Sequence, residues 1–157
     1  MTFPPSVSAP PPSSNRTPPD IRLHGGSLGT VLVVEDEPLM RLFVVRALQG
    51  AGYDTLDADS AERALQLLEQ DGASIRSVVA DVKLPGASGP ELAEQAREIV
   101  PGLPTLLMSG SGRHALLNER LITRDADVLQ KPFRIADLLR KLEQLLSPEP
   151  CLGVSGS

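Results

Sequence analysis

Four short apolar segments of the chain are each followed by side chains that suit the binding of a metal ion or a phosphoryl group. They are Glu35, Asp36 and Glu37 after residues 31–34, Asp81 after 77–80, Ser109 after 105–108 and Lys131 shortly after 127–129. If these segments are neighbouring parallel strands, their carboxyl ends meet at one rim and the carboxylates crowd together. Crowded carboxylates repel one another or take up protons, and a hard divalent cation relieves that repulsion. Mg²⁺ is suited because it takes a few carboxylates, keeps some waters and bridges to phosphate oxygens.

Each of these residues also has a structural explanation when it is taken alone. Asp36 or Glu37 can cap a helix that begins near Pro38. Ser109 can bond to the local backbone, and Lys131 can be a solvated surface charge. The convergence of four strand ends on one rim favours the functional interpretation over these separate ones.

The elements that position these residues alternate between short apolar runs and segments of helical periodicity. Strands are expected at 31–34, 53–58, 77–80, 105–108 and 127–129, and the continuous apolar run 31–34 is typical of a parallel strand buried on both faces. Helices are expected from about residue 38 to Gly50, from Ala61 to Gly72, from a capping box at Ser88 to Pro101, over 113–122 with a weaker pattern, and over 135–146. The first of them is indicated by the helical spacing of its apolar residues, Leu39, Leu42, Phe43 and Ala47. Five such units with right-handed crossovers predict an α/β fold, a flavodoxin-like (βα)5 doubly wound parallel sheet of strand order 2-1-3-4-5.

Composition and charge limit the classes of function. The chain has 157 residues, which favours one domain, and its formal net charge of -5 argues against direct nucleic-acid binding. A lone cysteine, Cys151, permits no intrachain disulfide, no apolar run is long enough to span a membrane, and no secretory signal begins the chain. We therefore expect a cytoplasmic protein that has no membrane partner.

Three regions follow from the same reading. Residues 1–27 hold seven prolines and are expected to be a disordered tail, either a docking ligand, a linker remnant or the product of a start codon assigned too early. Residues 28–147 are expected to form the folded domain. Residues 148–157 are expected to be a short disordered tail.

Four segments of the sequence resemble the signature segments of response-regulator receiver domains of two-component signalling. They are Val31–Pro38 (VLVVEDEP), Val79–Gly86 (VADVKLPG), Leu107–Gly110 (LMSG) and Leu129–Phe133 (LQKPF). The intervals of 45, 28 and 22 residues that separate Asp36, Asp81, Ser109 and Lys131 agree with the family. The resemblance covers residues 29–147. The sequence of these segments looks most like receivers attached to hybrid sensor kinases or stand-alone relatives of them.

The resemblance implies a phosphoryl acceptor and a metal site. Asp81 would take a phosphoryl group from a phosphohistidine on a sensor histidine kinase or a histidine phosphotransfer protein. Asp36, Asp81 and the backbone carbonyl of Lys83 would bind Mg²⁺, with Glu35 acting through water. The protein would then be a regulatory phosphoprotein and not an enzyme, catalysing only its own phosphoryl transfer and dephosphorylation.

The resemblance also implies how the phosphoryl group is held and sensed. Lys131 would pair with one phosphoryl oxygen and Ser109 with another, and the Lys131–Pro132 bond is expected to be cis. Receivers place an aromatic residue three positions before the lysine, where this chain has Val128, so we expect the segment 110–122 to carry the switch. Output to an unknown downstream protein is expected through protein contacts or phosphoryl relay, at the face built from the fourth helix, the fifth strand and the fifth helix.

Two other functions are compatible with parts of the sequence. A receiver-like adaptor would bind its partner without phosphorylation, and the Glu-Asp pair and Val128 leave this alternative open. A flavin or nucleotide binder of the same fold would need a phosphate-cradling Gly-rich loop after the first strand, where this chain has acids instead.

Overall fold

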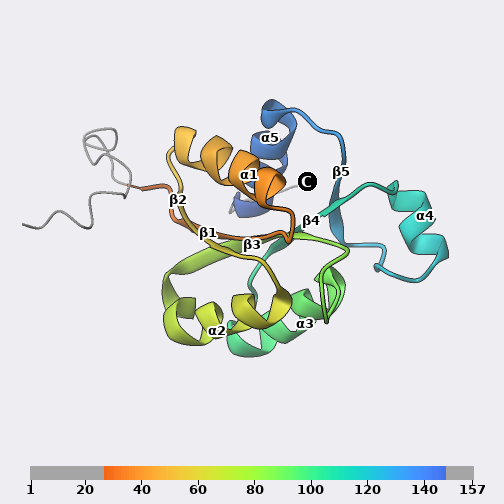
Figure 1. Ribbon diagram of the computed structural model, residues 1–157, viewed down its shortest axis with the longest axis horizontal. Helices are drawn as coiled ribbons and strands as arrows, with labels where there is room; N and C mark the ends of the chain where they lie inside the picture. Colours follow the sequence, from red (N-terminus) through yellow and green to blue (C-terminus); the bar gives the residue numbers. More distant parts are fainter. Residues whose placement is uncertain (1–26, 148–157) are drawn as a thin grey trace, which may run out of the picture.

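The computed structural model describes residues 27–147, which form one five-stranded parallel sheet with helices on both faces (Figure 1). The strands are β1 (Thr30–Val34), β2 (Asp54–Ala58), β3 (Ile75–Asp81), β4 (Thr105–Ser109) and β5 (Asp127–Gln130). The helices are α1 (Pro38–Gly50), α2 (Ala61–Asp71), the 3-10 turn η4 (Gly72–Ser74), α3 (Gly89–Ile99), α4 (Arg113–Asn118) and α5 (Ile135–Leu146). The predicted tails, 1–27 and 148–157, lie outside the described residues except for Ser27.

The strand order is β2-β1-β3-β4-β5, which confirms the predicted flavodoxin-like topology. The more polar segment, β2, and the short segment, β5, lie at the sheet edges, and the continuous apolar segment, β1, lies inside. Every pairing is parallel, and the register sets Val34 beside Ala80, Asp81 beside Met108 and Ser109 beside Gln130. The carboxyl ends of β1, β3, β4 and β5 therefore meet along one rim.

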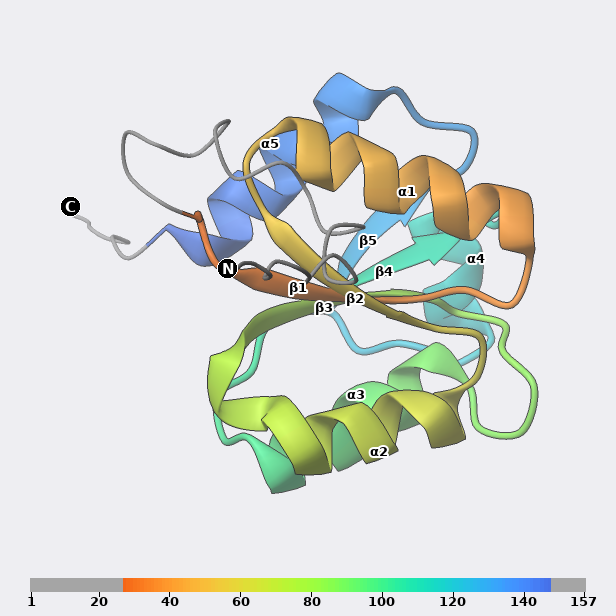
Figure 2. The same cartoon turned by 60° about the vertical axis from the view of Figure 1, so that its left-hand side comes forward.

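Helices α1 and α5 cover one face of the sheet, and α2 and α3 cover the other (Figure 2). Alternate side chains of β1 point into the two resulting cores: Val31 and Val33 into the α1/α5 core, Leu32 and Val34 into the α2/α3 core. Because both faces of β1 are covered, none of the side chains in its apolar run 31–34 is exposed, and none of them needs to be polar. This burial explains the continuous apolar pattern.

Local signals fix the first turns of α2 and α3. The predicted capping box opens α3, where the Ser88 hydroxyl accepts from the Glu91 N–H and the Glu91 carboxylate accepts from the Ser88 N–H. Ser60 caps α2 by accepting from the Arg63 N–H. By contrast, neither Asp36 nor Glu37 caps α1: the N-cap residue is Glu37 and its side chain makes no capping bond, so that structural interpretation was wrong.

Two expectations about helices need correction. The helix expected over 113–122 ends at Asn118, because the chain turns at Arg120, whose φ of 60° is left-handed, and Leu121 N–H bonds back to the Leu116 carbonyl. In α1, three of the apolar residues that indicated the helix, Leu39, Leu42 and Phe43, face solvent. Its core side is Val44, Ala47 and Leu48.

Within residues 27–147, no helix combines the length and the apolar character that crossing a bilayer requires.

Candidate functional site

The sheet brings the predicted site residues to one rim. Asp81 is the last residue of β3, Ser109 is the last residue of β4, Glu35 and Asp36 follow β1, and Lys131 follows β5. β1 and β3 are paired neighbours, as are β3 with β4 and β4 with β5. The topology therefore turns residues far apart in sequence into neighbours in space.

Three carboxylates form a compact acidic cluster. One oxygen from each of Glu35, Asp36 and Asp81 lies within 4.8 Å of the others. Glu35 is only 1% exposed, the Asp81 side chain is 12% exposed, and Asp36 is open to solvent. The cluster thus has a buried floor and an open side, which is the form of a site that binds a cation still carrying water.

The Lys131 ammonium joins this cluster from the other side. Its Nζ lies 3.1 Å from Asp81 Oδ2 and 3.3 Å from Glu35 Oε1. Burial alone would lower the pKa of Lys131, but the hydrogen bonds and charges of Asp81 and Glu35 outweigh it and raise the pKa. The side chain is therefore held as a cation at the point where it touches both carboxylates.

The burial of Glu35 affects the pKa of its carboxyl group. Desolvation raises its pKa, and the negative charge of Asp81 raises it further, while the N–H of Glu37 and the ammonium of Lys131 lower it. Oε2 of Glu35 accepts from the Glu37 N–H at 3.2 Å. The net direction is upward, and burial of the carboxylate is its largest cause.

Ser109 is 3% exposed and ends β4, the strand between β3, which carries Asp81, and β5, which precedes Lys131. Its Oγ accepts from the Ser111 N–H at 2.9 Å, and its carbonyl accepts from the Lys131 N–H at 2.7 Å. The second bond ties β4 to the start of the Lys131–Pro132 turn, whose peptide bond is cis as predicted.

The two other residues named from the sequence are placed as follows. Lys83 is exposed, and its N–H points to Asp81 Oδ1 at 3.4 Å, while metal binding by its carbonyl stays a prediction. Val128 is 8% exposed and packs in the α2/α3 core with Leu116 of α4. A valine here leaves no large side chain to rotate, so the idea that the segment 110–122 carries the switch also stays a prediction.

Sequence reasoning missed two residues that shape the rim. A Cβ on Gly89 would lie 2.3 Å from the Asp81 carbonyl oxygen, so only glycine lets α3 begin this close to the end of β3. The Arg41 guanidinium donates to the Glu35 carbonyl at 2.8 Å. Gly89 could have been found from the sequence, because it stands between a capping serine and a proline at the start of a helical pattern. No local pattern identifies Arg41.

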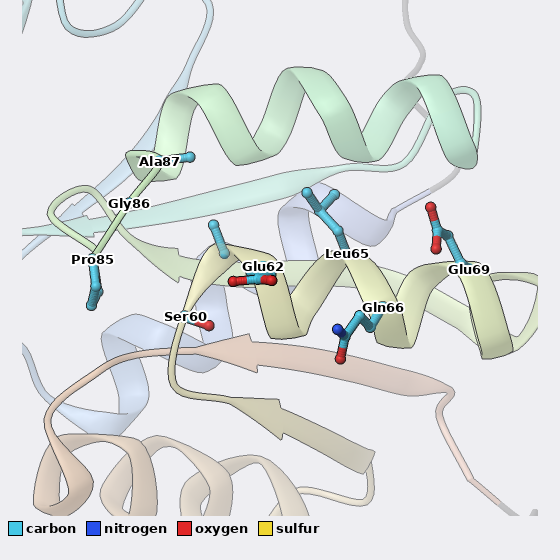
Figure 3. Close-up of a pocket in the computed structure, with 9 residues that line it drawn as sticks. Ser60, Glu62, Leu65, Gln66, Glu69, Pro85, Gly86 and Ala87 are labelled. Carbon is cyan, nitrogen blue, oxygen red and sulfur yellow. The ribbon is translucent and has the colours of Figure 1, made fainter.

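Two hollows of the described surface lie away from the acidic cluster. One of about 490 Å³ lies between α2 and the turn 85–87, where Leu65 projects from α2 toward α3 and Glu62 and Glu69 lie along the helix (Figure 3). Another, of about 580 Å³, lies between α3 and the segment 120–127. A small hydrated cation with a transferable phosphoryl group needs converging charges more than a deep cavity, so we place the candidate site at the rim.

The donor set of the rim fits the metal implied by the sequence. Hard oxygen ligands from three carboxylates, one of them solvent-exposed, suit Mg²⁺, which keeps several waters when it binds protein. Soft or nitrogen ligands are absent from the acidic cluster itself, which speaks against a zinc or copper centre at this place.

Comparisons with known proteins agree with this geometry. The chain matches the response regulator receiver domain family over residues 31–143. It is 36% identical over 116 residues to the response regulator receiver protein CpdR of Brucella abortus (strain 2308), covering 74% of this chain and 95% of CpdR.

Two solved structures have a similar fold. The receiver domain of the hybrid histidine kinase CckA matches with a TM-score of 0.64 and 32% identity, covering 76% of this chain and 100% of that domain. A response regulator receiver protein from Sinorhizobium medicae WSM419 matches with a TM-score of 0.67 and 30% identity, covering 78% of this chain and 95% of the other. Together with the strand order and the rim of acids, hydroxyl and ammonium, these matches show that the chain belongs to the response regulator receiver domain family of two-component systems.

Proposed function

We propose that the protein is a phosphoacceptor receiver that takes a phosphoryl group on Asp81 with Mg²⁺ bound at the rim. The observation that carries the proposal is the meeting of three carboxylates with one ammonium: Lys131 Nζ lies 3.1 Å from Asp81 Oδ2, beside a group of carboxylates that could hold a cation. A structural ion pair would need one carboxylate and not three.

The residues divide the chemistry among them. An Asp81 carboxylate oxygen attacks phosphorus in line, the P–N bond to a phosphohistidine breaks, and the electron pair returns to the imidazole nitrogen, which takes a proton. Glu35, Asp36, Asp81 and the Lys83 carbonyl are the residues that would hold Mg²⁺, Glu35 through water, and the ion would supply positive charge for the phosphoryl oxygens. Little covalent chemistry is asked of the protein, so positioning and charge provide most of the rate.

Lys131 and Ser109 would hold the product. The Lys131 ammonium pairs with Asp81 Oδ2 in this structure. Once Asp81 is phosphorylated, the ammonium would pair with a phosphoryl oxygen instead, acting as a point charge. The Ser109 hydroxyl accepts from Ser111 N–H and keeps its own proton to donate to a second phosphoryl oxygen. Hydrolysis of the acyl phosphate would return the domain to its starting state.

The phosphodonor would be a protein, a sensor histidine kinase or a histidine phosphotransfer protein. Support comes from an apolar surface beside the site: Leu39, Leu42, Phe43 and Ile135 are exposed and line one shallow hollow of about 360 Å³. Both helices concerned begin within a few residues of the site, α1 after Glu37 and α5 after Arg134. Exposed apolar residues gathered in this way mark protein contact surfaces. Output through α4, β5 and α5 stays a prediction.

The test is covalent labelling followed by mass measurement. The protein is incubated with acetyl phosphate, with Mg²⁺ or with EDTA, and its intact mass is measured beside that of Asp81→Asn. We expect a single added phosphoryl group on the wild-type protein in Mg²⁺ only, and none on Asp81→Asn. Equal labelling of both proteins would contradict the assignment of Asp81, and no labelling of either would favour an adaptor that acts without phosphorylation.

A further inference from the structure

The turn between β1 and α1 carries two of the three clustered carboxylates, yet the usual devices that hold such a turn are missing from it. The N-cap residue Glu37 makes no side-chain capping bond, and the first turn of α1 has no acidic residue. Pro38 at the first helical position has no N–H to donate. Bonds other than a side-chain cap must therefore hold Glu35 and Asp36 in place.

Arg41 holds the turn in a different way from a cap: a capping side chain accepts from free N–H groups of the helix, whereas the Arg41 side chain donates to a carbonyl and pairs with a carboxylate. Its backbone N–H donates to the Glu37 carbonyl at 2.9 Å, while its side chain turns back along the helix, as helical side chains do. NH1 donates to the Glu35 carbonyl at 2.8 Å, and Nε lies 3.1 Å from Asp57 Oδ2 on β2. One planar guanidinium thus ties α1, the end of β1 and the neighbouring strand together.

The bonded carbonyl belongs to the most buried member of the acidic cluster. Glu35 is held at its side chain by Lys131 and the Glu37 N–H, and at its backbone N–H by the Ala58 carbonyl at 3.0 Å. The bond from Arg41 completes this set at the backbone carbonyl. The peptide that it orients joins Glu35 to Asp36, so its rotation would move both carboxylates at once.

We propose that Arg41 is a positioning residue for the metal site: its guanidinium fixes the Glu35–Asp36 peptide and so sets the geometry in which the two carboxylates meet Asp81. The inference rests on the proposed function, since it concerns the cation that this function requires. Arg41 touches neither the cation nor the phosphoryl group and acts through the turn that carries their ligands.

Two effects of Arg41 on a cation oppose each other, which makes the inference testable. As a positive charge, Arg41 repels Mg²⁺, so its removal would tighten binding if charge were its whole effect. As a positioning group, it improves binding, so its removal would weaken it. Partners that orient metal ligands typically contribute about 10-fold or more to metal affinity, and the guanidinium is partly exposed to a screening solvent, so we expect geometry to prevail.

The experiment measures the dissociation constant of Mg²⁺ by calorimetry and by the shifts of backbone amide signals, on the wild-type protein, Arg41→Ala and Arg41→Lys. Arg46→Ala is the matched control: it removes the same charge from the same helix, but Arg46 is exposed and makes no bond to the turn. Urea unfolding in EDTA for each variant separates a loss of metal affinity from a loss of the fold.

The expected result is a dissociation constant raised about 10-fold in Arg41→Ala, partly restored in Arg41→Lys, which can reach one partner but not both, and unchanged in Arg46→Ala. In labelling with acetyl phosphate, the Mg²⁺ concentration for half-maximal rate should rise more than the maximal rate falls. Equal or tighter binding by Arg41→Ala would overturn the inference while leaving the proposed function intact. Failure of the wild-type protein to bind Mg²⁺ at all would overturn both.

Discussion

Gly89 connects the fold to the chemistry, and its replacement by alanine gives a prediction that can be worked from coordinates. The added Cβ would lie 2.3 Å from the Asp81 carbonyl oxygen and 3.0 Å from both Asp81 C and Val82 Cα. All three are backbone atoms, so no flexible side chain can move aside. The N–H of Gly89 also bonds to the Val82 carbonyl at 2.9 Å, which holds the two segments at this separation.

The size of the effect follows from the contact. Ordinary van der Waals contact begins at 3.4 Å, so α3 or the end of β3 must shift by about 1 Å. Forced overpacking of this kind costs about 1–3 kcal/mol in unfolding free energy, which lowers the urea midpoint by about 1 M. Because Asp81 is the residue being pushed, a shift of about 1 Å should also slow phosphoryl transfer by up to about 100-fold.

The assay is urea unfolding followed by circular dichroism, together with the rate of labelling by acetyl phosphate. Gly50→Ala is the control, since a Cβ there meets nothing within 4 Å and Gly50 ends α1, where alanine is expected to stabilise by up to about 1 kcal/mol. The two alanine variants should therefore move the midpoint in opposite directions. A Gly89→Ala protein as stable and as readily labelled as the wild type would refute the reasoning.

Three further predictions concern single groups or segments. The Ser77 hydroxyl is fully buried and has no hydrogen-bond partner among the described residues. Ser77→Ala should therefore raise the unfolding free energy by about 1 kcal/mol in the same urea assay. A loss of stability would contradict this prediction. The Lys131 ammonium lowers the pKa of Glu35. In Lys131→Met, carbon-13 NMR should therefore show a higher pKa for the Glu35 carboxyl than in the wild-type protein. An unchanged or lower pKa would show that the ammonium does not act on Glu35. A phosphoryl mimic should displace the backbone over residues 109–122 and 127–135. If crystal structures with and without the mimic superpose within coordinate error over these residues, the segment 110–122 does not carry a switch.

The strand segments were the easiest part of the fold to predict, and the reason is burial. Residues 31–34 are apolar throughout, and residues 78–80 are apolar after the buried Ser77, because the sheet is covered on both faces, while the more polar strand β2 lies at an edge. The topology then placed Asp81 beside Glu35. Local chemistry at Ser88 also located the start of α3, because a capping box is a short-range pattern.

What escaped prediction depends on contacts between distant residues. The apolar spacing of α1 pointed to Leu39, Leu42 and Phe43, yet these lie on the solvent side, since periodicity finds an apolar face without telling what covers it. α4 ended early because its last residues turn through a bond between Leu121 and Leu116, which no propensity foretells. Arg41 is an ordinary helix residue in sequence and becomes significant only when Asp57 and the Glu35 carbonyl are placed beside it.

A crystal structure of the protein with Mg²⁺ and beryllofluoride tests the central claim most directly, because the adduct marks the phosphoryl acceptor without relying on activity. The account predicts beryllium bonded to an Asp81 carboxylate oxygen, Mg²⁺ coordinated by Asp36 and Asp81, and the Lys131 ammonium turned from Asp81 to a fluoride. An adduct on a different carboxylate, or a cation bound away from Asp36 and Asp81, would contradict it.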